Sequence, residues 1–205
     1  MDATTPHTYA LPDLLYATDA LEPTISSRIM ELHHGTHHGA YVKGANELND
    51  KLLALPIGDD PSALNRSLAF NLSGHRLHSL FWTSMSPSGG GTPDGPLAEA
   101  IKSSFGDTKT LIDRMTMTIE KLAGSGWAAL SWDNLGQRLV VSQIHDHQHD
   151  HAAGLTPVLV IDGWEHAYYL QYEAAKAKWA AAFWDIVDWN STGARLTTVM
   201  ARPLV

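Results

Sequence analysis

The sequence predicts an α+β fold in which an N-terminal helical hairpin precedes a half of mixed helices and antiparallel strands. Three observations support this prediction. Two long segments with helical spacing of apolar residues come first, the glycine- and proline-rich stretch Ser86–Pro96 then interrupts the chain, and three strand-like runs follow. A length of 205 residues suits one large domain or two small domains that share a core.

The hairpin is predicted from two helices in the first half. Pro23 and Thr24 are start signals for a first helix over residues 22–55. The stretch "PIGDDP" at 56–61 contains two prolines and a glycine and ends that helix. A second helix is predicted over residues 62–85, where leucines recur at helical spacing.

The second half alternates between the two kinds of regular structure. Helices are predicted over 97–105 and 108–122. Two strands within 127–144 flank a turn with the sequence "DNLG", and a third strand covers 155–162. Residues 163–189 are predicted to be helical.

Composition excludes several classes of protein. The chain is 44% hydrophobic and 18% charged, which is an ordinary globular balance. It has no cysteine, so a metal would be held by nitrogen and oxygen ligands, as iron, manganese or zinc can be. A net charge of −8 disfavours nucleic acid as a partner. No secretory signal or apolar run of membrane-spanning length is visible, so we expect a cytoplasmic protein with no membrane contact.

Histidines are unusually frequent and lie in groups. There are 12 of them beside only 14 Lys and Arg residues. They gather at positions 33–38, 75–78, 145–151 and 166. The last position lies in "VIDGWEH", where three ionisable side chains follow an apolar run, and a bound metal would stabilise such groups against burial.

Two segments offer further ligands. His33, His37 and Tyr41 are four residues apart and therefore share one face of a helix, with His34 and His38 on a neighbouring stripe. This face is either solvated or holds one metal ligand with two groups behind it.

Another source is the second helix, where Gly74 permits close approach of another element. Its His75 and His78 adjoin apolar residues. Asp162 ends a strand and His166 follows on the first helical turn, so both side chains can point at one centre.

The chain resembles the iron/manganese superoxide dismutase family over nearly its whole length. The matching stretches are "LHHGTHHGAYVKGANELN", "AFNLSGHRLHSLFWTSMSPSGGG", "GSGWAAL" and "DGWEHAYYLQY", in the order of the family. The resemblance implies an N-terminal antiparallel helical hairpin followed by an α/β domain with a three-stranded antiparallel sheet. The corresponding domains are residues 1–90 and 91–205.

The resemblance also implies an activity and a metal. One iron or manganese ion per subunit would cycle between +3 and +2 while two superoxide anions and two protons become O2 and H2O2. Zinc does not cycle and would not support this chemistry. The metal ligands implied by the family motifs are His33, His78, Asp162 and His166.

Three catalytic residues follow from the same resemblance. Tyr41 matches a gateway tyrosine, with His37 one turn before it as its relay. Because Gly74 occupies the second-helix position from which some relatives supply an outer-sphere donor, His147 of the late hairpin takes that role. Aromatic residues are expected to wall the site, namely Phe81, Trp82, Trp127 and Trp164.

The family implies a homodimer or a homotetramer. Glu165 would bond the partner's His166, and Tyr169 would contact the partner's His37. The alternative is that Glu165 is an acid in a first helical turn, which the helix dipole favours.

Substrate attraction is expected to be weaker than in many relatives. Thr36 stands where many have lysine, and Glu173 replaces another lysine, although Lys176 is kept. Since superoxide is an anion, fewer cations at the entrance reduce its steering.

Other possibilities remain open at this stage. One is a hydrolase with a metal-activated hydroxide, and another is a metal-buffering protein without activity. His145, His149 and His151 are expected to be exposed turn residues, with a weak accessory metal site as the alternative. The sequence does not choose between iron and manganese, or between dimer and tetramer.

Overall fold

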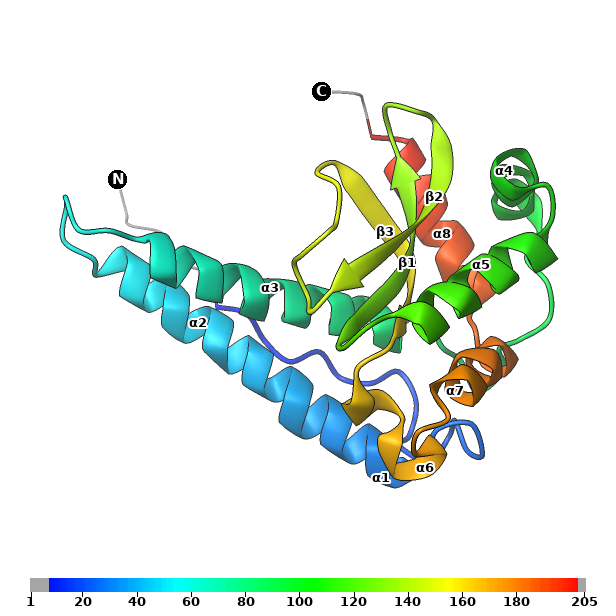
Figure 1. Ribbon diagram of the computed structural model, residues 1–205, viewed down its shortest axis with the longest axis horizontal. Helices are drawn as coiled ribbons and strands as arrows, with labels where there is room; N and C mark the ends of the chain where they lie inside the picture. The colour runs from blue at the N-terminus through cyan, green and yellow to red at the C-terminus, as the bar shows by residue number, and fades with distance from the viewer. Residues whose placement is uncertain (1–7, 203–205) are drawn as a thin grey trace.

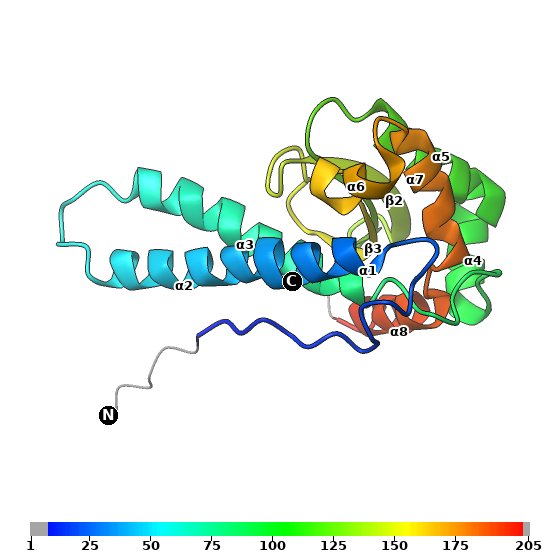
Figure 2. The ribbon, with the colours of Figure 1, turned by 90° about the horizontal axis from the view of Figure 1, so that it is seen from below.

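The first half of the chain forms the predicted helical hairpin. The computed structural model describes residues 8–202. A continuous helix consists of α1 (Ser27–Met30), a π-helical segment (Glu31–His38) and α2 (Gly39–Leu53). It packs against the antiparallel α3 (Ser62–Trp82), and this hairpin projects from the rest of the molecule in both views (Figures 1 and 2).

The first helix begins later than predicted. Ser26 is its N-cap, and the Ser26 hydroxyl accepts a hydrogen bond from the backbone N–H of Ile29 at 3.4 Å. Leu21 and Ile25 lie buried in the turns that precede this cap. The prediction of a helix from residue 22 is therefore wrong, because the apolar residues before Ser26 are buried by turns and not by a helix.

Three antiparallel strands form the predicted sheet. They are β1 (Gly126–Asp133), β2 (Arg138–His145) and β3 (Leu155–Asp162). The order is β2-β1-β3, so β1 is central and the other two strands are edges. The predicted α+β fold with a three-stranded antiparallel sheet is confirmed.

Helices surround this sheet on the side away from the hairpin tip (Figure 1). α4 (Gly95–Phe105) and α5 (Thr108–Lys121) pack on β2, and α7 (Lys176–Ala182) packs on α5. The last helix, α8 (Trp189–Met200), contacts β3 and was not predicted.

The predicted helix over residues 163–189 is wrong as one element. The chain there forms a short 3-10 helix (Glu165–Ala167), α6 (Tyr169–Tyr172), α7 and a further 3-10 turn (Phe183–Asp185). Glu173 adopts a φ of 49°, which no right-handed helix continues through. The break follows from this local conformation, which apolar periodicity does not reveal.

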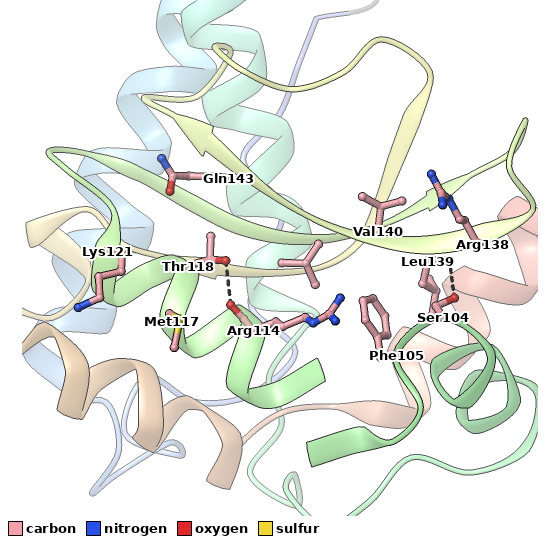
Figure 3. Close-up of a pocket in the computed structure, with 11 residues that line it drawn as sticks. Ser104, Phe105, Arg114, Met117, Thr118, Lys121, Arg138, Leu139, Val140 and Gln143 are labelled. Carbon is pink, nitrogen blue, oxygen red and sulfur yellow. Dashed lines mark hydrogen bonds between the residues drawn. The ribbon is translucent and has the colours of Figure 1, made fainter. Parts of the chain in front are cut away.

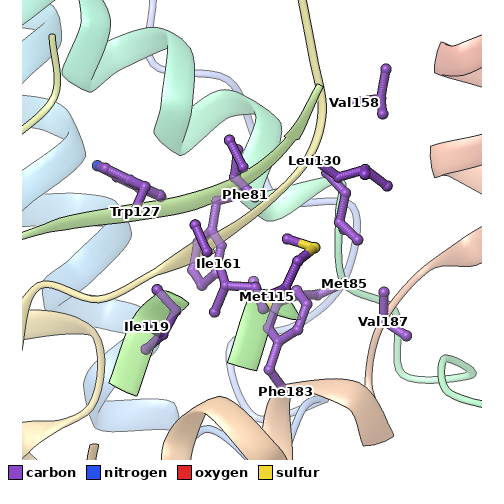
Figure 4. Close-up of a cluster of buried hydrophobic side chains, with 14 of the residues drawn as sticks. Phe81, Met85, Met115, Ile119, Trp127, Leu130, Val158, Ile161, Phe183 and Val187 are labelled. Carbon is purple, nitrogen blue, oxygen red and sulfur yellow. The ribbon is translucent and has the colours of Figure 1, made fainter. Parts of the chain in front are cut away.

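One core joins the hairpin to the sheet and the later helices (Figure 4). It includes Phe81 of α3, Met115 of α5, Trp127 of β1, Ile161 of β3 and Phe183. Burying each such side chain contributes roughly 1.5–3 kcal/mol. The domain boundary at residue 90 stays a prediction, because buried residues on both sides of it belong to the same cluster.

The described helices are all too short or too polar to cross a membrane.

Candidate metal centre

Four side chains from distant parts of the chain converge at the junction of the hairpin and the sheet. Each offers one metal-ligating atom, and these atoms lie within 4.8 Å of one another. The π-helical segment, α3, the end of β3 and the following 3-10 helix supply them. The four residues are His33, His78, Asp162 and His166.

The π-helical segment decides which histidines of the first helix turn inward. With 3.6 residues per turn, His33, His37 and Tyr41 would form one stripe. In the wider π-helical turn, His33 and His38 are the two fully buried residues, while His37 is only partly buried. Of the two alternatives left open for this face, burial of His33 and His38 favours the one with a ligand and further groups behind it. π-helical turns are frequent at functional sites.

Hydrogen bonding directs His78 toward the centre. Its Nδ1–H donates to the carbonyl of Gly74 at 2.7 Å, so its Nε2 carries a free lone pair. Within the described chain, the Nε2 atoms of His33 and His78 are buried without a hydrogen-bond partner. A buried unpartnered acceptor is costly, and a cation between these atoms would relieve that cost.

Asp162 supplies the single negative charge of the cluster. Its Oδ1 accepts from the backbone N–H of Trp164 at 2.8 Å. Its Oδ2 lies 3.1 Å from His33 Nε2 and 3.3 Å from His166 Nε2. Burial acts to raise the pKa of Asp162, but the two facing imidazoles outweigh it and hold that pKa well below its usual range.

Two histidines of the cluster, His33 and His78, are suited to bind a metal as neutral ligands. Burial, reinforced by His166, lowers the pKa of His33 to about 4. Burial also lowers the pKa of His78 well below its ordinary value. Neutral imidazoles and a carboxylate are nitrogen and oxygen donors that iron and manganese accept, so this donor set fits either ion.

His147 lies beside the cluster with its ring held by two tryptophans. Trp127 Nε1–H donates to His147 Nδ1 at 3.0 Å, and burial lowers the pKa of His147 to about 4. The neutral ring therefore carries its proton on Nε2, which is buried without a partner among the described residues. The ring of Trp164 stacks on His147 at 4.5 Å and an angle of 14°.

Tyr41 packs between α3 and His147. Its ring centroid is 5.2 Å from that of His78 and 4.6 Å from that of His147. A Cβ on Gly74 would lie 2.9 Å from the Tyr41 ring, so only glycine fits there without displacement. Burial, with a contribution from Asp162, raises the pKa of Tyr41, which keeps its hydroxyl protonated.

His37 covers the cluster from the outer side. Its ring stacks on that of His166 at 4.4 Å and 20°, and it is only partly buried. The expected aromatic wall is present. The ring centroids of Trp82 and His33 are 4.8 Å apart, and those of Trp127 and His78 are 5.0 Å apart. These rings exclude bulk water from the donor atoms.

A hydrogen-bonded pair formed by the buried His38 and the half-buried His75 was not recognised in the sequence as part of the site. Trp82 Nε1–H donates to His38 Nδ1 at 2.9 Å, so His38 donates from Nε2 to His75 Nδ1 at 2.8 Å. The His38 ring also stacks on the His78 ring, with 5.3 Å between the ring centroids. Spacing alone gave no signal for it, because His38 turns inward only through the π-helical register.

The histidines of the turn after β2 do not form a comparable cluster. His145 Nδ1 pairs with Asp150, Gln148 bonds His149 Nε2 at 2.9 Å, and His151 Nε2 donates to the carbonyl of Leu155 at 3.1 Å. Among residues 8–202, only the centre described above brings three or more ligands together. The turn therefore lacks the geometry for the alternative accessory site.

Three imidazoles and one carboxylate, held between a helical hairpin and a three-stranded sheet, define a mononuclear metalloprotein without thiolate ligands. Residues 8–86 match the alpha-hairpin domain of the iron/manganese superoxide dismutases, and residues 93–195 match their C-terminal domain. The chain belongs to the iron/manganese superoxide dismutase family.

Individual relatives cover most of the chain. A "Superoxide dismutase [Mn]" from Corynebacterium diphtheriae is 50% identical over 92% of this chain and 96% of its own length. A "Superoxide dismutase [Fe]" from Mycobacterium tuberculosis is 45% identical over 91% of this chain and 92% of its own length.

The family decides between the functions that the sequence left open. The protein is an iron- or manganese-type superoxide dismutase, its substrate is superoxide, and it has a single iron or manganese site formed by three histidines and one aspartate. A hydrolase and a metal-buffering protein without activity are thereby set aside.

Proposed function

We propose that four residues hold one ion per subunit and that three more serve the dismutation of superoxide. The ligands are His33, His78, Asp162 and His166, and the catalytic residues are Tyr41, His37 and His147. The observation that carries this assignment is the pair of buried Nε2 atoms of His33 and His78, which face the carboxylate of Asp162 and have no hydrogen-bond partner in the described part of the chain.

Iron or manganese in this site supplies a one-electron couple between the +3 and +2 states, which zinc lacks. Two superoxide anions and two protons then give one O2 and one H2O2, so charge and atoms balance. Burial keeps the imidazoles of His33 and His78 neutral, which makes their lone pairs available at neutral pH.

His147 serves as a fixed hydrogen-bond donor at the centre. The Trp127 N–H occupies its Nδ1, and the proton on Nε2 is left to face the buried site. The stacked ring of Trp164 restrains its rotation. Such second-layer donors change metal affinity or activity by about 10- to 100-fold when they are removed.

Tyr41 and His37 serve the entrance and the movement of protons. The buried hydroxyl of Tyr41 keeps its proton over the physiological range, because its pKa is raised. His37 is partly exposed and stacks on His166, so it connects solvent with the centre. We expect the Tyr41→Phe variant to retain its metal and to show reduced turnover at high pH. Unchanged turnover would contradict this role.

The relatives support either metal, because proteins of 45% and 50% identity are named as iron and manganese enzymes. Protein expressed separately in iron- and manganese-supplemented media, followed by elemental analysis and an assay of each form, tests the assignment. We expect one ion per chain and dismutase activity in at least one form. Full loading without activity in either form would overturn it.

Assembly as a homodimer or homotetramer is part of this proposal. Tyr169 is 50% exposed and Leu170 is 65% exposed, beside Glu165, and such a surface suits an interface. Glu165→Ala is expected to loosen the dimer and to lower metal retention together. Sedimentation and metal analysis that show no change in either quantity would contradict this.

A cytoplasmic location remains a prediction from the sequence, and fractionation of the native cells tests it.

A further inference from the structure

A groove of about 620 Å³ runs between the helices α4 and α5 and the strand β2 (Figure 3). None of the proposed metal or catalytic residues lines it. Its floor is apolar and includes Phe105, Val141 and Met117, whose side chain is 58% exposed. A cavity of this size falls in the range of binding sites.

The middle of β2 is an open sheet edge in this groove. The backbone N–H of Leu139 points away from β1, since it donates to the Ser104 hydroxyl at 3.0 Å. The N–H and carbonyl of His145 also point outward and pair with His149. Backbone direction alternates along a strand, so Val141 and Gln143 share this outward direction. Their outward backbone groups have no hydrogen-bond partner among the residues that the structure describes.

On the opposite edge of the sheet, outward backbone carbonyls are hydrogen-bonded to side chains. On β3, the carbonyl of Val158 accepts from Arg195 Nε at 2.7 Å. The carbonyl of Asp162 accepts from Trp179 Nε1 at 2.7 Å. α3 and α8 also pack on this strand. Both ends of the β2 edge are closed and the β3 edge is covered, so the open stretch is confined to the groove.

The groove is positively charged in an acidic protein. Arg114, Lys121 and Arg138 line it, and no Asp or Glu of the described residues does, although the chain carries a net charge of −8. Arg114 lies 5.5 Å over the ring of Phe105 and forms no ion pair with a described residue. Lys121 pairs only with a neighbouring exposed acid at 3.4 Å. Exposed pairs of this kind are worth about 0–1 kcal/mol, so Lys121 remains available beside Arg114. Arg138 Nε lies 3.7 Å from Asp133 Oδ2, so its charge is partly balanced within the chain.

We propose that this groove binds an extended acidic segment of another protein as an added strand on β2. The backbone of Val141 and Gln143 supplies the pairing groups, and the cations select acidic side chains. Alternate residues of such a strand would face the apolar floor. Pairing of two β2 edges from two copies is disfavoured, because it would bring the same three cations together.

Binding of a synthetic probe tests this proposal. The probe is a fluorescein-labelled peptide of five residues with alternating glutamate and valine, measured by fluorescence anisotropy with the metal-loaded enzyme at low salt. We expect Arg114→Glu to weaken binding at least about tenfold, which is near the effect of one close charge reversal. The matched control is Lys109→Glu, on the same helix but outside the groove, which should change binding by less than about twofold.

Amide hydrogen exchange separates strand addition from simple ion pairing. The bound peptide should slow hydrogen exchange at the backbone amides of Val141 and Gln143. A peptide of alternating lysine and valine should neither bind nor slow this exchange. Equal weakening by Lys109→Glu, peptide binding without amide protection, or dimer formation through β2 in sedimentation would each overturn the proposal. Dismutase activity should be unchanged in both variants, which verifies folding and keeps this test independent of the proposed metal centre.

Discussion

Two histidine-rich regions of this protein have opposite properties. In the metal centre, His33 and His78 come from different helices, and their buried Nε2 atoms face Asp162 without a hydrogen-bond partner among residues 8–202. At the end of β2 and in the turn after it, His145 and His149 bond to side chains within a few residues. The comparison teaches that the number of histidines does not make a metal site. Convergence from distant elements does, because only then do donor atoms remain free in the interior.

His147 belongs to the turn by sequence and to the metal centre by position. It is 2% exposed, whereas the histidines on either side of it are not fully buried. Its ring contacts Trp127 and Trp164 and makes no hydrogen bond to another described residue of the turn. Burial against the sheet therefore separates the two kinds of histidine.

The largest effect is expected from loss of the central carboxylate. Asp162→Asn keeps the shape but removes the negative charge that faces three imidazoles. We expect loss of metal in elemental analysis and a fall in dismutase activity of more than about 100-fold, beyond the effect of outer residues. The matched change in the turn is Asp150→Asn, which should alter activity by less than about twofold because its pair is exposed. Equal effects would erase the distinction between the regions.

Acid should destabilise the metal-free protein through the buried centre. The pKa of His33 is about 4 in the folded protein and about 6.5 in the unfolded chain, so the unfolded chain binds more protons between these values. The free energy of unfolding therefore falls as pH drops from about 6.5 to 4, by up to ~1.4 kcal/mol per pH unit from this residue.

Urea denaturation of the metal-free protein at several pH values measures this slope, and His33→Asn should reduce it. A flat profile between pH 6.5 and 4.5 would contradict the proposed burial of neutral imidazole.

A smaller effect is expected where the turn meets the centre. Trp127→Phe removes the donor that fixes the proton of His147 on Nε2. We expect metal content to be retained and activity to fall about tenfold, with a shifted pH profile. Trp164→Phe is the control, because its N–H bonds the carbonyl of Asp146 and not His147. If both variants have the same pH profile, the tautomer is not the cause.

Charge at the entrance should have a modest effect. Thr36 is exposed beside the partly buried His37, and Lys176 donates to the carbonyl of Leu122 at 2.5 Å, which restrains its ammonium group. The native kcat/KM should therefore depend weakly on salt. Thr36→Lys should raise kcat/KM about two- to threefold at low salt, with the gain lost near 0.15 M. Thr36→Gln is the neutral control, and a steep native salt dependence would refute weak steering.

The smallest effect is expected in the turn itself. Replacing His145, His149 and His151 together by Gln should leave metal stoichiometry and activity unchanged. Stability should fall by only about 1 kcal/mol, since His151 loses its bond to the carbonyl of Leu155. Loss of a second bound ion in elemental analysis would show that the turn binds metal after all.

Local patterns predicted the larger elements. The hairpin helices and the three strands were predicted because their apolar spacing is a local property. The π-helical turn around His33 was not, because its register depends on packing against α3 and on the burial of His38. The break at Glu173 was also missed, since it depends on one residue's φ. The helix α8 was missed although its buried Trp189, Leu196 and Val199 follow helical spacing, so a local signal for it was present.

The sequence by itself determined which donors exist, in what order, and that thiolates are absent. It also supported the four-ligand set through the family motifs. Only the tertiary structure decided that these four atoms lie within 4.8 Å, that His38 turns inward, and that the middle of β2 remains open. The reason is physical: coordination and edge pairing depend on distances and directions between groups far apart in the chain, and no local pattern contains them.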